Sequence, residues 1–430
     1  MEKNLDQIFN EFANILGSLR ELNKSVIKLS EDMVKSAFES TVDELEDIYL
    51  IVFESLDYKL LTNCGSEDIS KEDLIKIANN LIENKSEVQE NVINRFRRMI
   101  ENNTEENLNK ILKEKDAIIK LHKEQIKANM SYRAMLFTLT SATENFLKEI
   151  LEYIYRNYDN KEFDINIKFS LSDLNDYDSI DHMRDELLKK QIDSVFWGNI
   201  ESVIKEIQKY NKSYFLTKKE LNVLYEIFAR RNIHMHNNGK INQAYIYKVT
   251  NESLSIGEEL MLSAEYLESS ILNTIYMSYI ITFAVAINSN PKNKDEYVNR
   301  LLCSCVELID EKDYFIAKQI LNKIDKRGIY ENTITKYFIL VNKYLIKILE
   351  NEIREKDMHE LEKIQKELKF RKEDTRELAL GINCLRGQKK EFIEKIREVK
   401  AEKFQEKFLR YPIVKLLDLT KSEKEFILNI

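Results

Sequence analysis

Apolar residues recur every three or four positions along most of the chain, and this spacing places them on one face of an α-helix. The first such stretch runs from Leu5 to Met33 and predicts one amphipathic helix. The pattern continues after a predicted loop at 63–66. We therefore expect residues 1–125 to form an N-terminal helical arm or bundle.

A second helical region is predicted for residues 126–290. It begins within the stretch 118–158, which no glycine or proline interrupts and whose second half carries a broad apolar face. The next stretch, 159–213, is acidic and irregular, and there we expect loops and short helices. A helix from about Thr217 then ends at 237–239, because Asn and Gly tolerate the left-handed conformation that closes a helix.

The stretch 269–291 carries no charged side chain, and its length is borderline for a membrane span. Polar residues such as Asn273 and Thr282 interrupt it. A helix that is apolar all round is also typical of the centre of a bundle or of a dimer interface. We therefore expect this helix to be buried in protein, and we expect no membrane association.

Pro291 is the first proline of the chain, and we place a domain boundary there. From 291 to 430, helical patterns alternate with turns predicted near Gly328, Gly381 and Gly387. Stacked helical hairpins of tetratricopeptide type fit this alternation, although no strict period is visible. We expect a C-terminal helical-repeat domain that senses a trigger or a regulatory partner protein.

The composition agrees with an all-α fold. The 430 residues include 2 prolines and 8 glycines, too few for the many tight turns of strand-rich folds. The formal net charge of -8 argues against a protein that coats nucleic acid indiscriminately, because such binding needs cations that neutralise phosphates. A local basic groove is still compatible with that charge.

The 4 cysteines and the absence of a signal-like N-terminal run favour a reducing cytoplasm. Cys303 and Cys305 form a C-x-C pair, but no histidine lies near them in sequence, and their apolar neighbours predict a core role rather than a metal site. The sequence contains no Gly-rich phosphate loop, no H-E-x-x-H or C-x-x-C motif and no nucleophile elbow. We expect no metal and no cofactor.

Two of the 5 histidines stand beside two arginines in the segment 230–239. Arg231, Asn232 and His236 spell R-N-x-x-x-H. This resembles the signature of the HEPN superfamily, which is an Arg, a polar residue, and a His four to six positions after the Arg. The resemblance covers about 118–291. It implies a small HEPN-like helical bundle with metal-independent endoribonuclease activity, of the kind found in bacterial anti-phage, abortive-infection and toxin systems.

Metal-independent RNA cleavage needs a base for the ribose 2′-OH proton, an acid for the leaving 5′-oxygen and a cation for the charged phosphorane. His suits proton transfer near neutral pH, and Arg clamps phosphate while it stays charged. We assign proton transfer to His236, phosphate binding to Arg231, and orientation of the phosphate or 2′-OH to Asn232. Glu226 and Asn237, which flank the motif, are supporting candidates.

Helical geometry leaves a second assignment open. Residues five apart, such as Arg231 and His236, point about 140° away from each other on an ideal helix. They converge on one phosphate only if the helix ends between them or if two chains meet, so we expect a homodimer with a composite site. Arg230 and His234 share one helix face and form the competing pair.

The charge around the motif favours a polyanion such as RNA. Between residues 205 and 248 there are nine basic and three acidic residues. Lys218, Lys219 and Lys240 are the candidate RNA-binding residues. Arg and His at a helix end also complement the helix dipole without any chemistry. The alternative to a ribonuclease is therefore a non-catalytic helical scaffold, or a module that binds nucleic acid or a partner protein.

Overall fold

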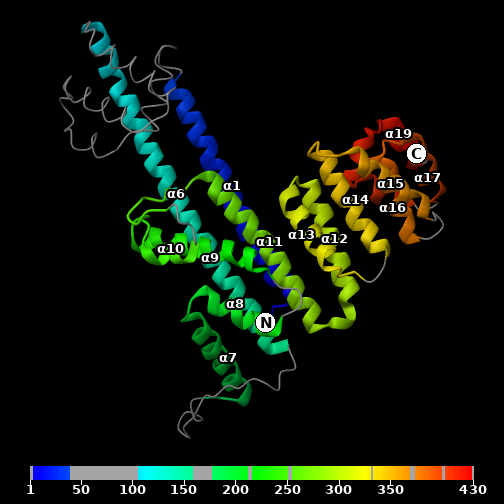
Figure 1. The fold of residues 1–430 in the computed structure, drawn as a ribbon, viewed down its shortest axis with the longest axis horizontal. Coiled ribbons are helices and arrows are strands. Elements are labelled where there is room, and N and C mark those ends of the chain that lie inside the picture. The colour runs from blue at the N-terminus through cyan, green and yellow to red at the C-terminus, as the bar shows by residue number, and fades with distance from the viewer. Residues whose placement is uncertain are drawn as a thin grey trace. The chain divides into compact units, whose positions relative to one another are not determined.

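The structure is a computed structural model that describes residues 3–38, 105–157, 177–211, 216–249, 254–330, 333–368, 373–399 and 402–428. Within these ranges every regular element is an α-helix or a short 3-10 helix, and one isolated antiparallel bridge joins Lys240 to Glu259 (Figure 1). The all-α prediction is therefore confirmed. The predicted loop at 63–66 and the first part of the irregular stretch lie outside the described residues.

Helix α1 (Leu5–Phe38) is the amphipathic helix expected at the start of the chain. Two ring contacts show what its apolar face packs against. Phe12 stacks on Phe146 of α6 (Glu105–Asn157), and Phe9 meets Tyr279 of α11 (Ala264–Ser289), each with ring centroids 4.5 Å apart. The buried residues of this face recur at helical spacing and are Leu5, Ile8, Phe12, Leu16 and Leu19.

The described residues belong to two compact units. The first comprises those within Met1–Leu19, Leu136–Leu260 and Glu265–Ile430, and the second comprises those within Arg20–Met135 and Met261–Ala264. In the second unit, the buried Asn23 donates its side-chain N–H to the backbone carbonyl of Ala264 at 3.1 Å. Residues on both sides of Pro291 belong to the first unit, and the three-domain division stays a prediction.

Helix α11 contains the uncharged stretch. It is the one helix in the described part of the chain that is long and apolar enough to cross a membrane by length and composition. The apolar window of α11 is 72% buried inside the protein. Ile271, Ile280 and Ala284 are among its fully or nearly fully buried residues. Burial within the fold therefore accounts for its composition, as expected for a core helix.

Four shorter helices lie between α6 and α11 in the chain. The four are α7 (Ile180–Phe196), α8 (Ile200–Tyr210), α9 (Lys218–His236) and α10 (Gln243–Val249). The isoleucines and the valine on one face of α8 are buried. Helix α8 packs against α7 and α9, and α10 packs against α9. Helices α7 and α8 confirm the short helices expected in the second half of 159–213.

The C-terminal part of the chain is a succession of helices that pack on their neighbours. Gly328 (φ 57°) and Gly387 (φ 65°) adopt the left-handed conformation at two predicted turns. The turn predicted near Gly381 is wrong, because Gly381 lies inside a helix where an added Cβ would approach Ile413 Cδ1 to 3.3 Å. The elements are η2 (Pro291–Asn293), α12 (Lys294–Asp310), α13 (Tyr314–Arg327), α14 (Thr333–Leu349), α15 (Glu355–Glu367), α16 (Glu373–Leu385), α17 (Lys389–Glu398), α18 (Glu402–Leu409), η3 (Pro412–Leu417) and α19 (Lys421–Leu428).

A buried ion pair joins α13 to the first turn of α9. Lys323 Nζ lies 2.6 Å from Glu220 Oε2, and the two side chains are 8% and 21% exposed. Tyr276 of α11 donates its hydroxyl to the same carboxylate, which also forms a capping box with Thr217. Burial is the largest influence on Glu220 and opposes its ionisation, but the hydrogen bonds from Lys323, Tyr276 and Thr217 together outweigh it and lower its pKa.

Candidate active site

Helix α9 carries the motif and ends directly after it. His236 is its last residue, Asn238 (φ 51°) and Gly239 (φ 80°) take left-handed conformations, and the N–H of Gly239 returns to the carbonyl of Ile233 at 2.9 Å. The stop predicted from Asn-Asn-Gly is therefore confirmed. The side chain of Asn237 donates to the carbonyl of Lys240 at 2.5 Å, so this amide holds the loop rather than facing a substrate.

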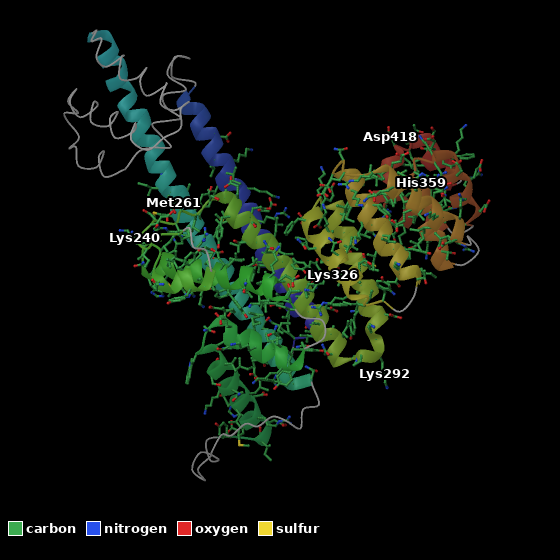
Figure 2. All side chains as sticks on the ribbon, viewed as in Figure 1. Lys240, Met261, Lys292, Lys326, His359 and Asp418 are labelled. Carbon is green, nitrogen blue, oxygen red and sulfur yellow. The ribbon has the colours of Figure 1, made fainter. Side chains whose placement is uncertain are left out.

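The loop after α9 is fixed by backbone pairing with a later segment. Ile241 N–H donates to the carbonyl of Glu258 at 2.8 Å, and Leu260 N–H donates to the carbonyl of Gly239 at 2.9 Å. Beneath this pairing, Ile241 packs with Ala229, Ile233 and Tyr245 in a small apolar cluster. Figure 2 labels Lys240 on this loop. These contacts hold the C-terminal end of α9 in place.

The outer face of α9 presents part of the predicted site. Asn232 and His236 are exposed, and the Arg231 side chain is 21% exposed. Arg231 Nη1 donates to Asn232 Oδ1 at 3.0 Å, and Arg231 Nη2 lies 3.8 Å from Glu144 Oε1 of α6. The structure therefore brings Arg231 and Asn232 together. His236 stands five positions further along the same helix, and no described hydrogen bond joins it to Arg231.

The inner face of α9 holds the competing pair. Arg230 Nε donates to Glu226 Oε1 at 2.8 Å, and its Nη2 lies 3.3 Å from the Tyr245 hydroxyl. The guanidinium also stacks 3.8 Å above the ring of Tyr266. The Arg230 side chain is 15% exposed, and His234 is buried at 5% exposure. His234 therefore belongs to the interior, whereas Arg230 is half-buried and held by its contacts with Glu226, Tyr245 and Tyr266.

The carboxylate of Glu226 organises this inner cluster. It accepts hydrogen bonds from the Tyr245 hydroxyl at 2.7 Å and from the Tyr266 hydroxyl at 2.8 Å, besides the one from Arg230. Burial, with the charge of Glu226, raises the pKa of both tyrosines, so they stay protonated donors. Burial opposes the charge of Arg230, but the two tyrosines and Glu226 outweigh it and raise its pKa. The cluster therefore connects α9, α10 and α11 through side-chain hydrogen bonds.

The basic residues counted around the motif are only partly available to a polyanion. Lys209 lies 2.5 Å from Glu206, and Lys248 lies 3.3 Å from Glu201. Because Arg230 is also paired, the excess of positive charge on the surface near the motif is smaller than the excess counted along the sequence. Lysines remain exposed at both ends of α9.

Lys218 and Lys219 are exposed in the first turn of α9, whereas His236 is its last residue. At 1.5 Å per residue, Lys218 and His236 are separated by about 27 Å along the helix axis. These two lysines and His236 therefore lie at opposite ends of α9, too far apart to contact one phosphate. Lys240 is exposed in the loop directly after the motif and is the candidate cation closest to it in the chain.

Two aromatic side chains near these elements are strongly exposed. Trp197, the C-cap residue of α7, is 86% exposed, and Tyr247 of α10 is 75% exposed. Exposed rings of this kind can stack on unpaired bases. Tyr245, two positions before Tyr247, is instead buried in the cluster around Glu226.

Glu144 and Tyr266 are parts of the site that the sequence did not point to. Each contacts an arginine of α9 from a helix far away in the chain, α6 for Glu144 and α11 for Tyr266. No local spacing could reveal either contact. Cys305 is buried as expected, but Cys303 is exposed and not a core residue, so that half of the prediction is wrong.

In the described ranges, no group of three or more His, Cys, Asp or Glu side chains is arranged to hold a metal ion. The histidines of the described ranges outside the motif, His122, His182 and His359, lie on α6, α7 and α15. What the motif offers chemically is a guanidinium, an amide and an exposed imidazole. Comparison of the chain with protein-family models, with curated proteins and with solved structures gives no match.

Proposed function

We propose that this chain is a metal-independent endoribonuclease of HEPN type. The observation that carries the proposal is the difference in exposure between the two histidines of the motif on α9. His236 is exposed, as is Asn232, whereas His234 is buried. Arg231 and Arg230 are both half-buried, at 21% and 15% exposure, but Arg230 is held by Glu226, Tyr245 and Tyr266. This difference favours the register of the HEPN signature over the competing pair.

In the proposed reaction, Arg231 and Asn232 bind the non-bridging oxygens of the scissile phosphate. Their side chains are already joined at 3.0 Å, so two donors are aligned before RNA arrives. His236 takes the proton of the 2′-OH as its oxygen attacks phosphorus, and the resulting imidazolium gives a proton to the 5′-oxygen as the bond from phosphorus to that oxygen breaks. The products are a 2′,3′-cyclic phosphate and a 5′-hydroxyl end.

A homodimer would complete this site. Since Arg231 and His236 diverge on one helix, the proposed site takes its arginine from one chain and its histidine from the other. Mixing inactive Arg231→Ala and His236→Ala chains tests this arrangement. About a quarter of wild-type activity should return, because half of the dimers are mixed and each has one intact site. Mixtures that stay inactive after subunit exchange contradict the composite site.

The direct test incubates purified protein with total cellular RNA in EDTA. Cleavage should persist, should leave cyclic phosphate ends and should spare DNA, which lacks the 2′-OH. His236→Ala should lower the rate by roughly 10²- to 10⁴-fold, the usual contribution of general acid–base catalysis. His234→Ala is the matched control for the register. Full loss in His234→Ala with normal cleavage in His236→Ala contradicts the assignment.

A non-catalytic module that binds RNA or a partner is the second candidate. One observation favours it: Glu144 lies against Arg231 and offsets part of its charge. Under this alternative the outer face still binds RNA, but cleavage is absent in every buffer. Binding by wild-type protein without any new RNA ends would decide for this candidate.

By its resemblance to HEPN proteins, we place this activity in a cytoplasmic anti-phage, abortive-infection or toxin system. The C-terminal helices would then sense the trigger or a regulatory protein. Expression of the wild-type chain in bacteria should arrest growth when the trigger is present, and His236→Ala should not. Growth arrest by both proteins would point away from RNA cleavage.

A further inference from the structure

The guanidinium of Arg231 meets a different partner at each of its two terminal nitrogens. Nη1 donates to Asn232 Oδ1 at 3.0 Å, which is a hydrogen bond to the next residue in the chain. Nη2 lies 3.8 Å from Glu144 Oε1 of α6, within the range of an ion pair but longer than a hydrogen bond. Glu144 therefore acts on Arg231 through its charge.

The neighbouring Arg230 shows how an arginine with a structural role is held in this protein. It has hydrogen bonds to Glu226 and Tyr245, and its guanidinium stacks on the ring of Tyr266. Arg231 is held less completely, because its Nε is shielded from solvent and has no hydrogen-bond acceptor among the described residues. Of the two arginines, Arg231 is therefore the one that can exchange its partners for the oxygens of a ligand.

The Glu144 carboxylate and an RNA phosphate compete for this cation. Both are anions, and both are satisfied by the N–H donors of a guanidinium. A phosphate that binds Arg231 also comes close to Glu144, and like charges repel most where water is partly excluded. Glu144 therefore opposes the binding of phosphate at Arg231.

We propose that Glu144 is a further residue of the RNA site, where it is a counterion that the scissile phosphate must displace from Arg231. The inference rests on the proposed role of Arg231 in phosphate binding. Because both side chains of the pair are partly exposed, the pair is weak, and Glu144 lowers the affinity for RNA without preventing binding. An RNA held by contacts elsewhere on the protein displaces it, whereas a phosphate group without such contacts does so poorly.

Fluorescence anisotropy with a labelled single-stranded RNA tests this on the full-length protein. The RNA carries 2′-O-methyl groups throughout, so it lacks the nucleophile and is not cleaved. Glu144→Gln should tighten binding by about two- to fivefold, the range expected for a partly exposed ion pair. Its affinity should also fall more steeply with salt, by up to about 0.7 in the slope of log K against log salt, which is one phosphate contact on a single strand. Glu144→Asp, which keeps the charge, should stay close to the wild type.

Two controls separate this effect from a general loss of negative charge. Glu149 lies on the same helix as Glu144, is 33% exposed against 38%, and pairs with Lys3 instead of Arg231. Glu149→Gln should therefore leave RNA binding unchanged. In an Arg231→Ala background, Glu144→Gln should have no effect, because the cation through which it acts is gone.

The outcomes distinguish this inference from the proposed function. Tighter binding in Glu144→Gln, with both controls silent, supports the inference even if the wild type cleaves no RNA, a result that refutes only the proposed function. If the wild type does cleave unmodified RNA, the gain in Glu144→Gln should appear in KM rather than in kcat. Weaker binding in Glu144→Gln would mean that the carboxylate positions Arg231 for RNA, and it overturns the inference while cleavage stands. Unchanged binding, equal tightening in Glu149→Gln, or no RNA binding by any variant overturns it too.

Discussion

Removing the amine of Lys323 should destabilise the protein far more than removing that of its neighbour Lys318. Both lysines lie on α13 and both are ion-paired, Lys323 with Glu220 at 2.6 Å and Lys318 with Glu350 at 2.8 Å. They differ in burial, since their side chains are 8% and 41% exposed. Substitution of each by Met keeps most of the chain length and removes only the charge.

The expected difference follows from what each substitution leaves behind. Breaking a fully buried pair costs about 3 to 5 kcal/mol, because the remaining charge stays desolvated. Glu220 is 21% exposed and keeps its bonds to Tyr276 and Thr217, so we expect about 2 kcal/mol for Lys323→Met. A surface pair contributes about 0 to 1 kcal/mol, which sets the expectation for Lys318→Met.

Urea denaturation followed by circular dichroism at the helical band measures both variants. The Lys323→Met midpoint should fall clearly below that of Lys318→Met, and Glu220→Gln added to Lys323→Met should recover part of the loss, because no lone charge then remains. Equal midpoints for the two single variants would refute the reasoning. They would mean that Lys323 is solvated in solution and that α13 does not hold the first turn of α9.

Three further predictions concern single positions. Gly239→Ala should cost about 1 to 2 kcal/mol in the same denaturation assay, because its φ of 80° strains a side chain, whereas Gly17→Ala on the exposed face of α1 should stabilise by about 0.5 to 1 kcal/mol. Folding lowers the pKa of Glu220 from its ordinary value of 4.5, so the ionised carboxylate stabilises the fold. The wild-type unfolding free energy should therefore fall as the pH drops below 4.5, and Glu220→Gln should flatten that part of the pH profile. His234→Ala should lower the stability by about 2 kcal/mol through the cavity it leaves, yet keep RNA cleavage, and a loss of cleavage without a loss of stability would contradict its interior position.

Local chemistry in the sequence was a good guide wherever neighbouring residues determine the structure. The Asn-Asn-Gly stop after His236 is where α9 ends, because left-handed conformations depend on the residues that adopt them. The same logic failed at Gly381, whose small size serves packing against Ile413 rather than a turn. A glycine alone does not distinguish these two uses.

Contacts between distant segments lay beyond what the sequence pattern could predict. The pairing of Arg231 with Glu144 joins residues on α9 and α6, and no periodicity records it. The basic count around the motif had the same weakness, since it could not show which lysines meet a carboxylate after folding. The neighbouring residues Arg230 and Arg231 have different partners for a simpler reason, because a step of about 100° along a helix points the two side chains in different directions.

The exposure of Trp197 determines what the protein's intrinsic fluorescence reports. It is the single tryptophan of the chain and is 86% exposed, so its indole is already in water in the native state. Unfolding will therefore shift the emission maximum little, and a fluorescence melt would miss the transition that circular dichroism detects. The same indole is a built-in optical probe of its surface, since quenching or a blue shift signals that a base or a protein has covered the end of α7.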